Sequence, residues 1–227
     1  MSDPALAKLN DDLAAAGFLL LGSFEPSADD DVPDIADGRP ARTLSLVGST
    51  GPSLWGPLTS APEYRDGTPH PMDRYTKRQL TRLAAVHGRK ALFPFEGPPY
   101  YPFQQWALKC GGFSQSPLGV LAHETYGPWT GFRAALLSAD PVILPDRSGE
   151  TGPCEDCHDR PCLTACPVSA ISAETGYNVS ACKDHLNKGP EIACWSGCLA
   201  RHACPYGQDH KPHPDNARFH MKSFVGA

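Results

Sequence analysis

The first helix that the sequence predicts spans residues 4–16. Leu6, Leu9 and Leu13 recur there at spacings of three and four residues, so a helix would bring them to one side. Gly17 follows directly, and glycine is the residue type that most often ends a helix. We therefore expect an amphipathic helix whose leucine side is buried.

A second helix is predicted to begin at Pro71 and to end at Gly88, and a shorter one to span residues 103–110. Proline suits the first turn of a helix, where its missing N–H is not needed. The buried side of the second helix is expected to consist of the apolar residues at helical spacing, namely Tyr75, Leu80, Leu83 and Val86.

Short apolar runs between turn-forming residues predict the strands. Five runs qualify: residues 18–24, 43–47, 90–95, 118–123 and 132–137. The acidic stretch 25–37 has no apolar periodicity and is expected to be a surface loop whose charges serve solvation. Helices mixed with strands indicate an α+β or α/β layer domain, and we assign the chain to the α+β class.

Composition narrows the class of protein further. The 227 residues are 41% hydrophobic and 20% charged, and no apolar run is long enough to cross a bilayer. The first residues lack the basic segment and cleavage pattern of a secretion signal, so we expect a cytoplasmic protein with no membrane partner. The formal net charge is -5 and Lys and Arg form no block, which argues against a nucleic-acid partner.

The cysteines divide the chain into two parts. Cys110 alone precedes residue 150, and the other eight lie between Cys154 and Cys204. The polar, turn-rich segment 145–150 separates the two parts and suits a linker. We predict one domain that binds a cofactor or partner, followed by a small cysteine-rich domain with a polar tail: residues 1–148 and 149–227.

The first four cysteines of the second part form a Cys-x2-Cys-x4-Cys-x3-Cys-Pro run from Cys154 to Pro167. This run is a variant of the bacterial ferredoxin pattern with two extra residues in its middle gap. In that pattern three closely spaced cysteines bind one [4Fe-4S] cubane, and the fourth, followed by proline, serves a second cubane. The run therefore predicts a two-cluster, ferredoxin-like domain.

The remaining thiolates that two cubanes need are supplied by Cys182, Cys194, Cys198 and Cys204. By the crossover rule, the first cluster would take Cys154, Cys157, Cys162 and Cys204, and the second Cys166, Cys182, Cys194 and Cys198. A reducing cytosol disfavours disulfides and leaves these thiolates free for metal. We expect the module to be largely unfolded without its clusters, because it has little apolar sequence of its own.

Two zinc sites of four thiolates each are an alternative interpretation, and they would make the module a rigid element with no redox role. Separated Cys-x2-Cys pairs are typical of zinc, whereas cysteines followed by proline favour iron. Cys110 lies in an apolar segment and is expected in the core. Three histidines lie in the polar tail, where we expect disorder: His210, His213 and His220.

The order of features from Tyr100 to Pro205 resembles the middle of epoxyqueuosine reductase, the cobalamin-dependent iron-sulfur enzyme of tRNA modification. That family also has a segment like Gln105–Gly112, a Tyr-Gly-x-Trp motif like Tyr126–Trp129, a four-cysteine run, a lone cysteine and a final Cys-Pro. Residues Leu121–Arg133 are similar to the His-x-x-x-Gly-x-Trp stretch of cobalamin-processing chaperones of the cblC type. The resemblance implies a nitroreductase-related α+β domain before the dicluster domain, and a bound cobalamin.

The same resemblance implies a set of site residues. Glu96 is the carboxylate nearest to the place where the reductase keeps its proton-donating Asp, and it would act as a general acid. A corrinoid, or a flavin in its place, would be bound by His123, Tyr126, Trp129, Phe132 and Arg133. The structural alternatives are a surface turn for Glu96 and ordinary core packing for the aromatic residues and the histidine.

Several parts of the reductase pattern are missing, among them an Arg-Tyr-Ala-type motif, an Asp before Pro98–Pro99 and a helical-repeat domain for tRNA. We therefore expect tRNA not to be the substrate. The leading hypothesis is a reductase-like protein that takes electrons from a redox partner or reduced donor and passes them through two clusters to a corrinoid. The alternative is a ferredoxin-like carrier whose first domain docks a redox partner and catalyses nothing.

Overall fold

The computed structural model describes residues 4–35, 38–142, 147 and 149–226. The chain forms two compact units. The first, called here the sheet unit, consists of Met1–Ser49, Ser53–Gly111 and Gly131–Gly149. The second, called here the cysteine unit, consists of Thr50–Pro52, Gly112–Thr130 and Glu150–Ala227.

The predicted linker 145–150 and the domain boundary at Ser148 lie largely outside the described residues. The division into domains 1–148 and 149–227 therefore stays a prediction. In the structure, residues Gly112–Thr130 belong to the same compact unit as the cysteine-rich segment, although they precede the predicted boundary.

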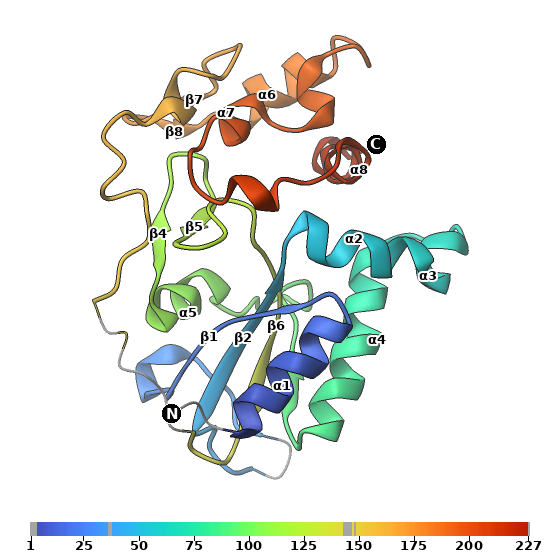
Figure 1. Cartoon of the computed structure of the whole chain (residues 1–227), viewed down its shortest axis with the longest axis vertical. Helices are drawn as coiled ribbons and strands as arrows, with labels where there is room; N and C mark the ends of the chain where they lie inside the picture. Colours follow the sequence, from blue (N-terminus) through green and yellow to red (C-terminus); the bar gives the residue numbers. More distant parts are fainter. Residues whose placement is uncertain (1–3, 36–37, 143–146, 148, 227) are drawn as a thin grey trace. The chain divides into compact units, whose positions relative to one another are not determined.

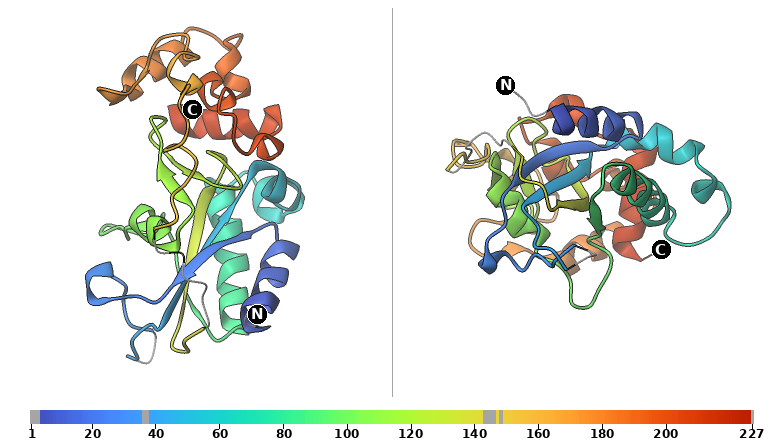
Figure 2. Two further views of the ribbon diagram at one scale, coloured as in Figure 1. Left: turned by 60° about the vertical axis from the view of Figure 1, so that its left-hand side comes forward. Right: turned by 90° about the horizontal axis from the view of Figure 1, so that it is seen from below.

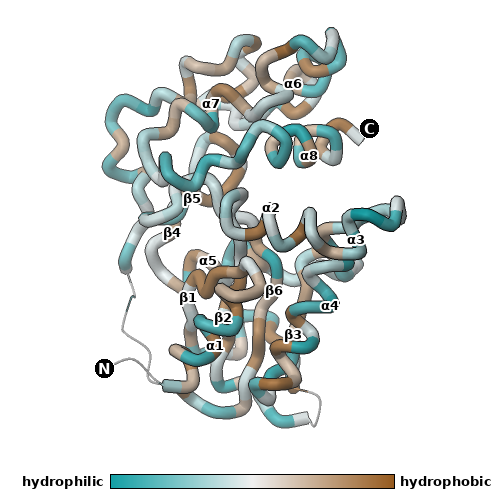
Figure 3. The backbone as a smooth tube through the Cα atoms, turned by 45° about the vertical axis from the view of Figure 1, so that its right-hand side comes forward, coloured by the Kyte–Doolittle hydropathy of each residue, from teal (hydrophilic) through white to brown (hydrophobic). Residues whose placement is uncertain are grey.

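An antiparallel sheet of four strands forms the centre of the sheet unit, in the order β1-β2-β6-β3. The strands are β1 (Leu19–Phe24), β2 (Thr43–Ser49), β6 (Gly131–Ser138) and β3 (Lys90–Leu92). Leu46 on β2 pairs with Ala135 on β6, and Ala91 on β3 pairs with Leu136. Every residue of β2 is buried, and β6 is one of the hydrophobic segments in Figure 3. Because every residue of β2 is buried, the sheet must be covered on both of its faces there.

Helices supply that cover (Figures 1 and 2). α1 (Pro4–Ala15) and α4 (Pro71–Val86) lie side by side on one face of the sheet, and α5 (Phe103–Cys110) lies against the other. The Tyr75 hydroxyl of α4 donates a hydrogen bond of 3.0 Å to the Ala16 carbonyl. On α5, the fully buried Trp106 donates from Nε1 to the Asp30 carbonyl at 2.8 Å.

Most of the predicted elements of the sheet unit are confirmed, and so is the α+β class. The predicted helices coincide with α1, α4 and α5 to within a residue or two. The strand predicted over 90–95 is shorter, because β3 ends at Leu92. Val86 was expected on the buried side of α4, but it is 63% exposed at the last residue of the helix.

Two further features of the sheet unit differ from expectation. α2 (Gly51–Ser60) and α3 (Pro62–Arg65) were not predicted. The acidic stretch 25–37 contains a short 3-10 helix, η1 (Ala28–Asp30), and Asp30 there is buried. The Ser27 N–H donates to the Asp30 carboxylate at 2.8 Å, and Lys109 forms an ion pair with it. This acidic side chain therefore has a structural partner, and solvation is not its main role.

The cysteine unit consists of short elements around a small core. A hairpin of β4 (Phe113–Gln115) and β5 (Leu121–His123) replaces the longer strand predicted over 118–123. The remaining elements are η2 (Pro161–Leu163), β7 (Ile171–Ser172), β8 (Gly176–Tyr177), α6 (Val179–Leu186), η3 (Ala193–Ser196), α7 (Leu199–His202), η4 (Gln208–His210) and α8 (Pro214–Val225). Leu118, Cys162, Ile171 and Ala200 form one of its buried clusters.

The expectation of a disordered tail is wrong for the residues described, because α8 is a helix. Pro214 occupies its first turn, and the His213 ring accepts a hydrogen bond of 3.3 Å from the Asp215 N–H. Asn216 and Ala217 are buried. Among the described residues, no helix is long and apolar enough to cross a membrane.

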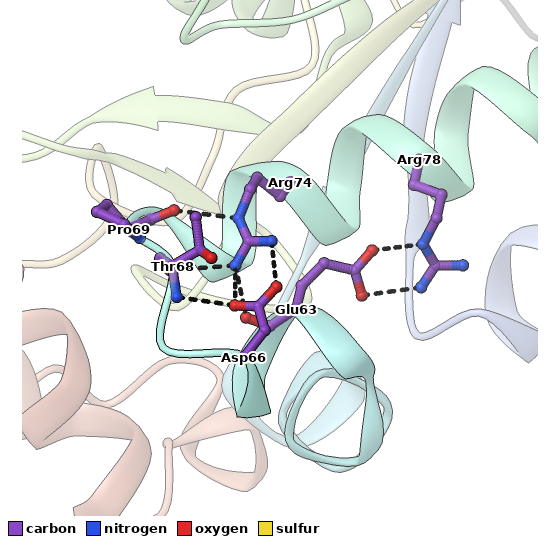
Figure 4. Close-up of polar contacts among 6 residues, drawn as sticks. All are labelled: Glu63, Asp66, Thr68, Pro69, Arg74 and Arg78. Carbon is purple, nitrogen blue, oxygen red and sulfur yellow. Dashed lines mark hydrogen bonds and ion pairs between the residues drawn. The ribbon is translucent and has the colours of Figure 1, made fainter.

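An ion-pair network joins α3 to α4 in the sheet unit (Figure 4). The Arg74 guanidinium donates to both carboxylate oxygens of Asp66 at 2.7 Å and to the Glu63 carbonyl at 2.7 Å. The Glu63 carboxylate accepts two hydrogen bonds from Arg78, one of them at 3.0 Å. Glu63 is only 8% exposed, so loss of its ion pair should lower the free energy of unfolding more than loss of a surface pair would.

Replacing Glu63 by Gln should lower the free energy of unfolding of the full chain by about 1–2 kcal/mol, because a charge-assisted bidentate contact is lost. The hydrogen bond from Arg78 lowers the pKa of Glu63 below its ordinary value of 4.5. The pair therefore contributes fully above that value and is lost only as the pH falls through the lowered pKa. The loss should be equal at pH 8 and pH 6 in urea titrations followed by circular dichroism.

Glu25→Gln is the matched control, because Glu25 pairs with Arg42 at 2.9 Å with its side chain 59% exposed. That variant should lose less than about 0.5 kcal/mol. Equal losses in the two variants, or a Glu63→Gln loss that changes between pH 8 and pH 6, would contradict this account.

Candidate metal centre

Two cavities in the cysteine unit are each lined by four cysteines. The first has a volume of about 390 Å³ and is lined by Cys154, Cys157, Cys162 and Cys204. The second is much smaller, about 20 Å³, and is lined by Cys166, Cys182, Cys194 and Cys198. The structure thus brings the eight predicted ligands together in the two groups that the crossover rule gives. That each group holds a cluster stays a prediction.

The four thiols of each group are close enough to affect one another electrostatically. Burial raises the pKa of Cys162, and the thiolates of Cys204, Cys154 and Cys157 raise it further. Burial also raises the pKa of Cys194, with Cys182 and Cys166 acting in the same direction. All nine cysteines of the chain are free, so none of these contacts is a disulfide.

The first group is attached to the β4–β5 hairpin. Thr151 forms a parallel bridge with Phe113, and the Cys154 N–H donates a hydrogen bond of 3.0 Å to the Ser114 hydroxyl. Gly152 lies so close to the hairpin backbone that a Cβ there would overlap the Ser114 amide. These contacts fix the start of the loop that carries three of the four thiols.

Backbone N–H groups act on two sulfurs of the second group. The Ala170 N–H donates to Cys166 Sγ at 3.2 Å. Cys198 is the N-cap residue of α7 without a side-chain capping hydrogen bond; burial raises its pKa, and the N–H groups of Arg201 and Ala200 oppose that rise. Donors of this kind favour the charged thiolate over the neutral thiol, which is the form that binds metal.

The donor set fits iron-sulfur clusters, since two groups of four thiolates are the ligands that two [4Fe-4S] clusters need. The free space in the second cavity, about 20 Å³, is close to what one water molecule needs, so its four sulfurs would have to move outward to admit a cubane. In the described part of the chain, no three His, Cys, Asp or Glu side chains are arranged around a point where a single ion would sit.

His123 and Tyr126, predicted to bind a corrinoid or flavin, pack against each other in the cysteine unit. Their rings stack at 4.8 Å, and His123 is buried. His123 Nδ1 accepts a hydrogen bond of 3.0 Å from the Thr125 N–H, so the proton of a neutral ring would lie on Nε2. Tyr126 also meets the His210 ring edge-on at 4.8 Å.

Trp129 has a similar environment. It is 5% exposed, meets the His202 ring edge-on at 5.3 Å, and lies under the Arg201 guanidinium at 5.1 Å. Its Nε1 has no hydrogen-bond partner among the described residues. The aromatic residues of the Tyr-Gly-x-Trp motif are therefore largely engaged by the segment that ends the cysteine-rich part of the chain.

The other predicted site residues belong to the sheet unit. Phe132 stacks on Phe103 at 6.4 Å, and Arg133 Nε donates to the Ser49 hydroxyl at 2.8 Å. Burial lowers the pKa of Arg133 to about 10, against the opposing effect of Asp73. The Glu96 carboxylate, 44% exposed, forms an ion pair of 2.7 Å with Lys77. The predicted cofactor set thus belongs to two compact units, three residues to one and two to the other.

Sequence reasoning missed three residues beside the cysteines. Tyr177 lines both cavities and forms a hydrogen bond with Cys182; burial and this bond raise the pKa of its hydroxyl. His185 lines the second cavity, and its buried Nδ1 has no partner among the described residues. Arg201 is partly buried, and the charges of Cys198 and Cys204 act on its pKa. The sequence offered one signal for these three residues: each lies within a few positions of a cysteine.

Comparison with known proteins gives structural likeness alone. No family model and no curated protein matches the chain. Among solved structures, the B12-trafficking protein CblC of C. elegans matches with a TM-score of 0.54 and 12% identity, over 95% of this chain and 91% of that one. This chain has the CblC-like α+β fold. The cblC-like fold expected from the resemblance is confirmed, and the ferredoxin-like dicluster domain stays a prediction.

Epoxyqueuosine reductases are also among the similar structures. The Streptococcus thermophilus enzyme has a TM-score of 0.46 and 14% identity, and the match covers 89% of this chain. A reductase solved with a tRNA stem loop has a TM-score of 0.48 and 15% identity over 94% of this chain. The chain spans about two thirds of the length of these two enzymes, 66% and 68%.

Gly127→Ala should destabilise the cysteine unit more than a strained backbone alone would. Gly127 has φ +55°, and a Cβ there would overlap the Tyr206 carbonyl, two residues after Cys204. Gly176 has a similar φ of +73° with open space around it, so Gly176→Ala should cost about 1–2 kcal/mol from conformation alone. Urea titrations of the full chain should give a clearly larger loss for Gly127→Ala, and equal losses would contradict the close packing.

Proposed function

We propose that the chain is an iron-sulfur, reductase-like protein that binds two [4Fe-4S] clusters in its cysteine unit and passes single electrons to a corrinoid held by its α+β fold. The observation that carries the proposal is the pair of cavities, each lined by four free cysteines. When bound, the clusters would supply one-electron chemistry that protein side chains lack.

The protein's own residues would hold and tune these groups. Cys154, Cys157, Cys162 and Cys204 would bind the first cluster, and Cys166, Cys182, Cys194 and Cys198 the second. Backbone N–H groups of Ala170, Ala200 and Arg201 would stabilise thiolate charge at the second site. The hairpin anchor at Ser114 would keep the first site in place.

The corrinoid part of the proposal is supported by the fold that the chain shares with a B12-trafficking protein. His123, Tyr126, Trp129, Phe132 and Arg133 are the residues proposed to meet the corrinoid. Glu96 is proposed as the proton donor, and its exposed carboxylate could leave Lys77 without a large loss of stability. The absence of a nucleic-acid partner stays an expectation from charge.

A ferredoxin-like electron carrier is the second candidate function. It is favoured by the environment of Tyr126 and Trp129, whose rings are in contact with His210, His202 and Arg201 of the chain itself. If these contacts persist in solution, the aromatic residues serve packing, and the α+β fold would dock a redox partner in place of a cofactor.

Anaerobic purification should give a brown protein with about eight iron atoms per chain. Cys154→Ala and Cys166→Ala should each lose about half of that iron, because each removes a ligand from a different cavity. Cys110→Ala is the matched control: Cys110 is buried in α5, outside both groups, and its variant should keep all its iron. Zinc in place of iron, or normal iron content in Cys154→Ala, would overturn the ligand assignment.

Titration of the iron-loaded protein with cob(II)alamin separates the two candidate functions. The reductase-like proposal predicts a saturable change of the visible and EPR spectra to the base-off form, weakened at least several-fold in Trp129→Ala if this ring contacts the macrocycle. Tyr64→Ala, which removes a partly exposed aromatic ring of the sheet unit, is the control. An unchanged spectrum at saturating cobalamin would favour the carrier.

A further inference from the structure

Arg201 is a partly buried cation with well-defined partners within the cysteine unit. Its Nε donates a hydrogen bond of 2.7 Å to the Pro128 carbonyl, and a second guanidinium nitrogen donates to the same oxygen. The guanidinium also lies 5.1 Å from the centroid of the Trp129 ring. The two hydrogen bonds to the Pro128 carbonyl and the cation–π contact with Trp129 fix both the position and the plane of the guanidinium.

No carboxylate in the described part of the chain pairs with Arg201. Burial lowers the pKa of this guanidinium, and the negative groups that oppose the effect are the thiolates of Cys198 and Cys204. A partly buried cation is stabilised by negative charge nearby. The position of Arg201 therefore favours negative charge close to these two cysteines.

The two cysteines belong to different cavities, and α7 connects them. Cys198, the N-cap residue of α7, lines the second cavity, and the Arg201 N–H opposes the rise of its pKa. Cys204, just beyond the helix, lines the first cavity, and its N–H donates to the Arg201 carbonyl at 3.2 Å. Arg201 thus lies in the chain between one ligand of each group, three residues from either.

We propose that Arg201 is a positioning residue whose fixed positive charge is shared by the two cluster sites and raises the reduction potential of both clusters. The inference rests on the proposed function, because it requires a cluster in each cavity. It adds a specific role for a residue outside the ligand set.

The direction of the effect follows from charge. A core of charge 2+ bound by four thiolates carries a net charge of about -2, and it becomes about -3 when it accepts one electron. A nearby cation attracts the reduced form more strongly than the oxidised form, so it makes reduction easier. Between two clusters, the same cation also offsets the repulsion that arises when both are reduced.

The test compares Arg201→Gln, Arg201→Lys and Lys188→Gln with the unaltered full chain, all purified without oxygen. Gln removes the charge and Lys keeps it while losing the planar fork. Lys188 is an exposed cation of the same unit, so Lys188→Gln makes the same change in net charge at the surface. Iron content is measured first, and each cluster is then titrated with dithionite and mediator dyes under EPR.

We expect both potentials to become more negative in Arg201→Gln, to stay close to those of the unaltered chain in Arg201→Lys, and not to move in Lys188→Gln. The proposal is overturned if Arg201→Gln keeps its iron with both potentials unchanged, if just one potential moves, or if Lys188→Gln moves them as much. Should Arg201→Gln lose its clusters, Arg201→Lys decides: retained iron and unchanged potentials support the role of the charge, and lost iron overturns the proposal, because the site then needs the planar guanidinium and not merely a positive charge.

Failure of this inference can be told apart from failure of the proposed function. A chain that holds about eight iron atoms and shows two titrating clusters supports the dicluster assignment whatever the Arg201 variants do. A chain with no iron removes the basis of both.

Discussion

The convergence of eight thiol groups is the constraint on which the cysteine unit depends. Burial and mutual repulsion raise the pKa of Cys162 and Cys194, so without metal these groups favour the neutral thiol. Metal binding needs the thiolate, and it therefore releases protons and supplies free energy that the folded chain gains and the unfolded chain does not. One buried apolar cluster of this unit includes a proposed ligand, Cys162.

The sheet unit is stabilised in a different way. Its core contains large, fully buried side chains such as Trp106, Phe18 and Leu46, and its sheet is covered on both faces. It needs no metal to bury apolar surface. If the proposed clusters are bound, the chain combines a unit that is stable through packing with one whose stability depends on ligation, and loss of iron would affect the second far more than the first.

Much of the sheet unit could be predicted because its signals are local. The leucines of α1 and the proline that opens α4 are visible within one or two turns of sequence. α2 was missed because Gly51, Gly56 and Pro57 are residue types that usually indicate turns, although Leu54 and Leu58 bury its inner side. Asp30 is paired with Ser27, three residues before it, and with Lys109, far away in sequence; the first contact has a local signal in the Ser-x-x-Asp spacing, and the second has none.

The candidate site shows the same division between local and distant information. Cysteine spacing restricts which sulfurs can face one point, so the two groups could be predicted from spacing alone. Arg201 and Tyr177 carry no such pattern, because their importance comes from burial and from neighbours supplied by other segments, Pro128 and Trp129 for Arg201 and Phe224 for Tyr177. Residues that would tune a metal site can be recognised only from the folded structure, whereas candidate metal ligands can be recognised from their spacing in the sequence.

The Tyr-Gly-x-Trp motif connects these observations. Gly127 and Gly207 let two backbone segments approach so closely that a Cβ at either position would overlap the other segment. Trp129 and the Pro128 carbonyl hold Arg201, and Tyr126 contacts His210, so the motif touches the chain on both sides of Cys204. A motif that the family resemblance assigns to a corrinoid therefore also fixes the last cysteine of the first group. Any molecule that displaces Trp129 would disturb Arg201, and through it the charge beside both cysteine groups, which would couple the proposed corrinoid to the proposed clusters.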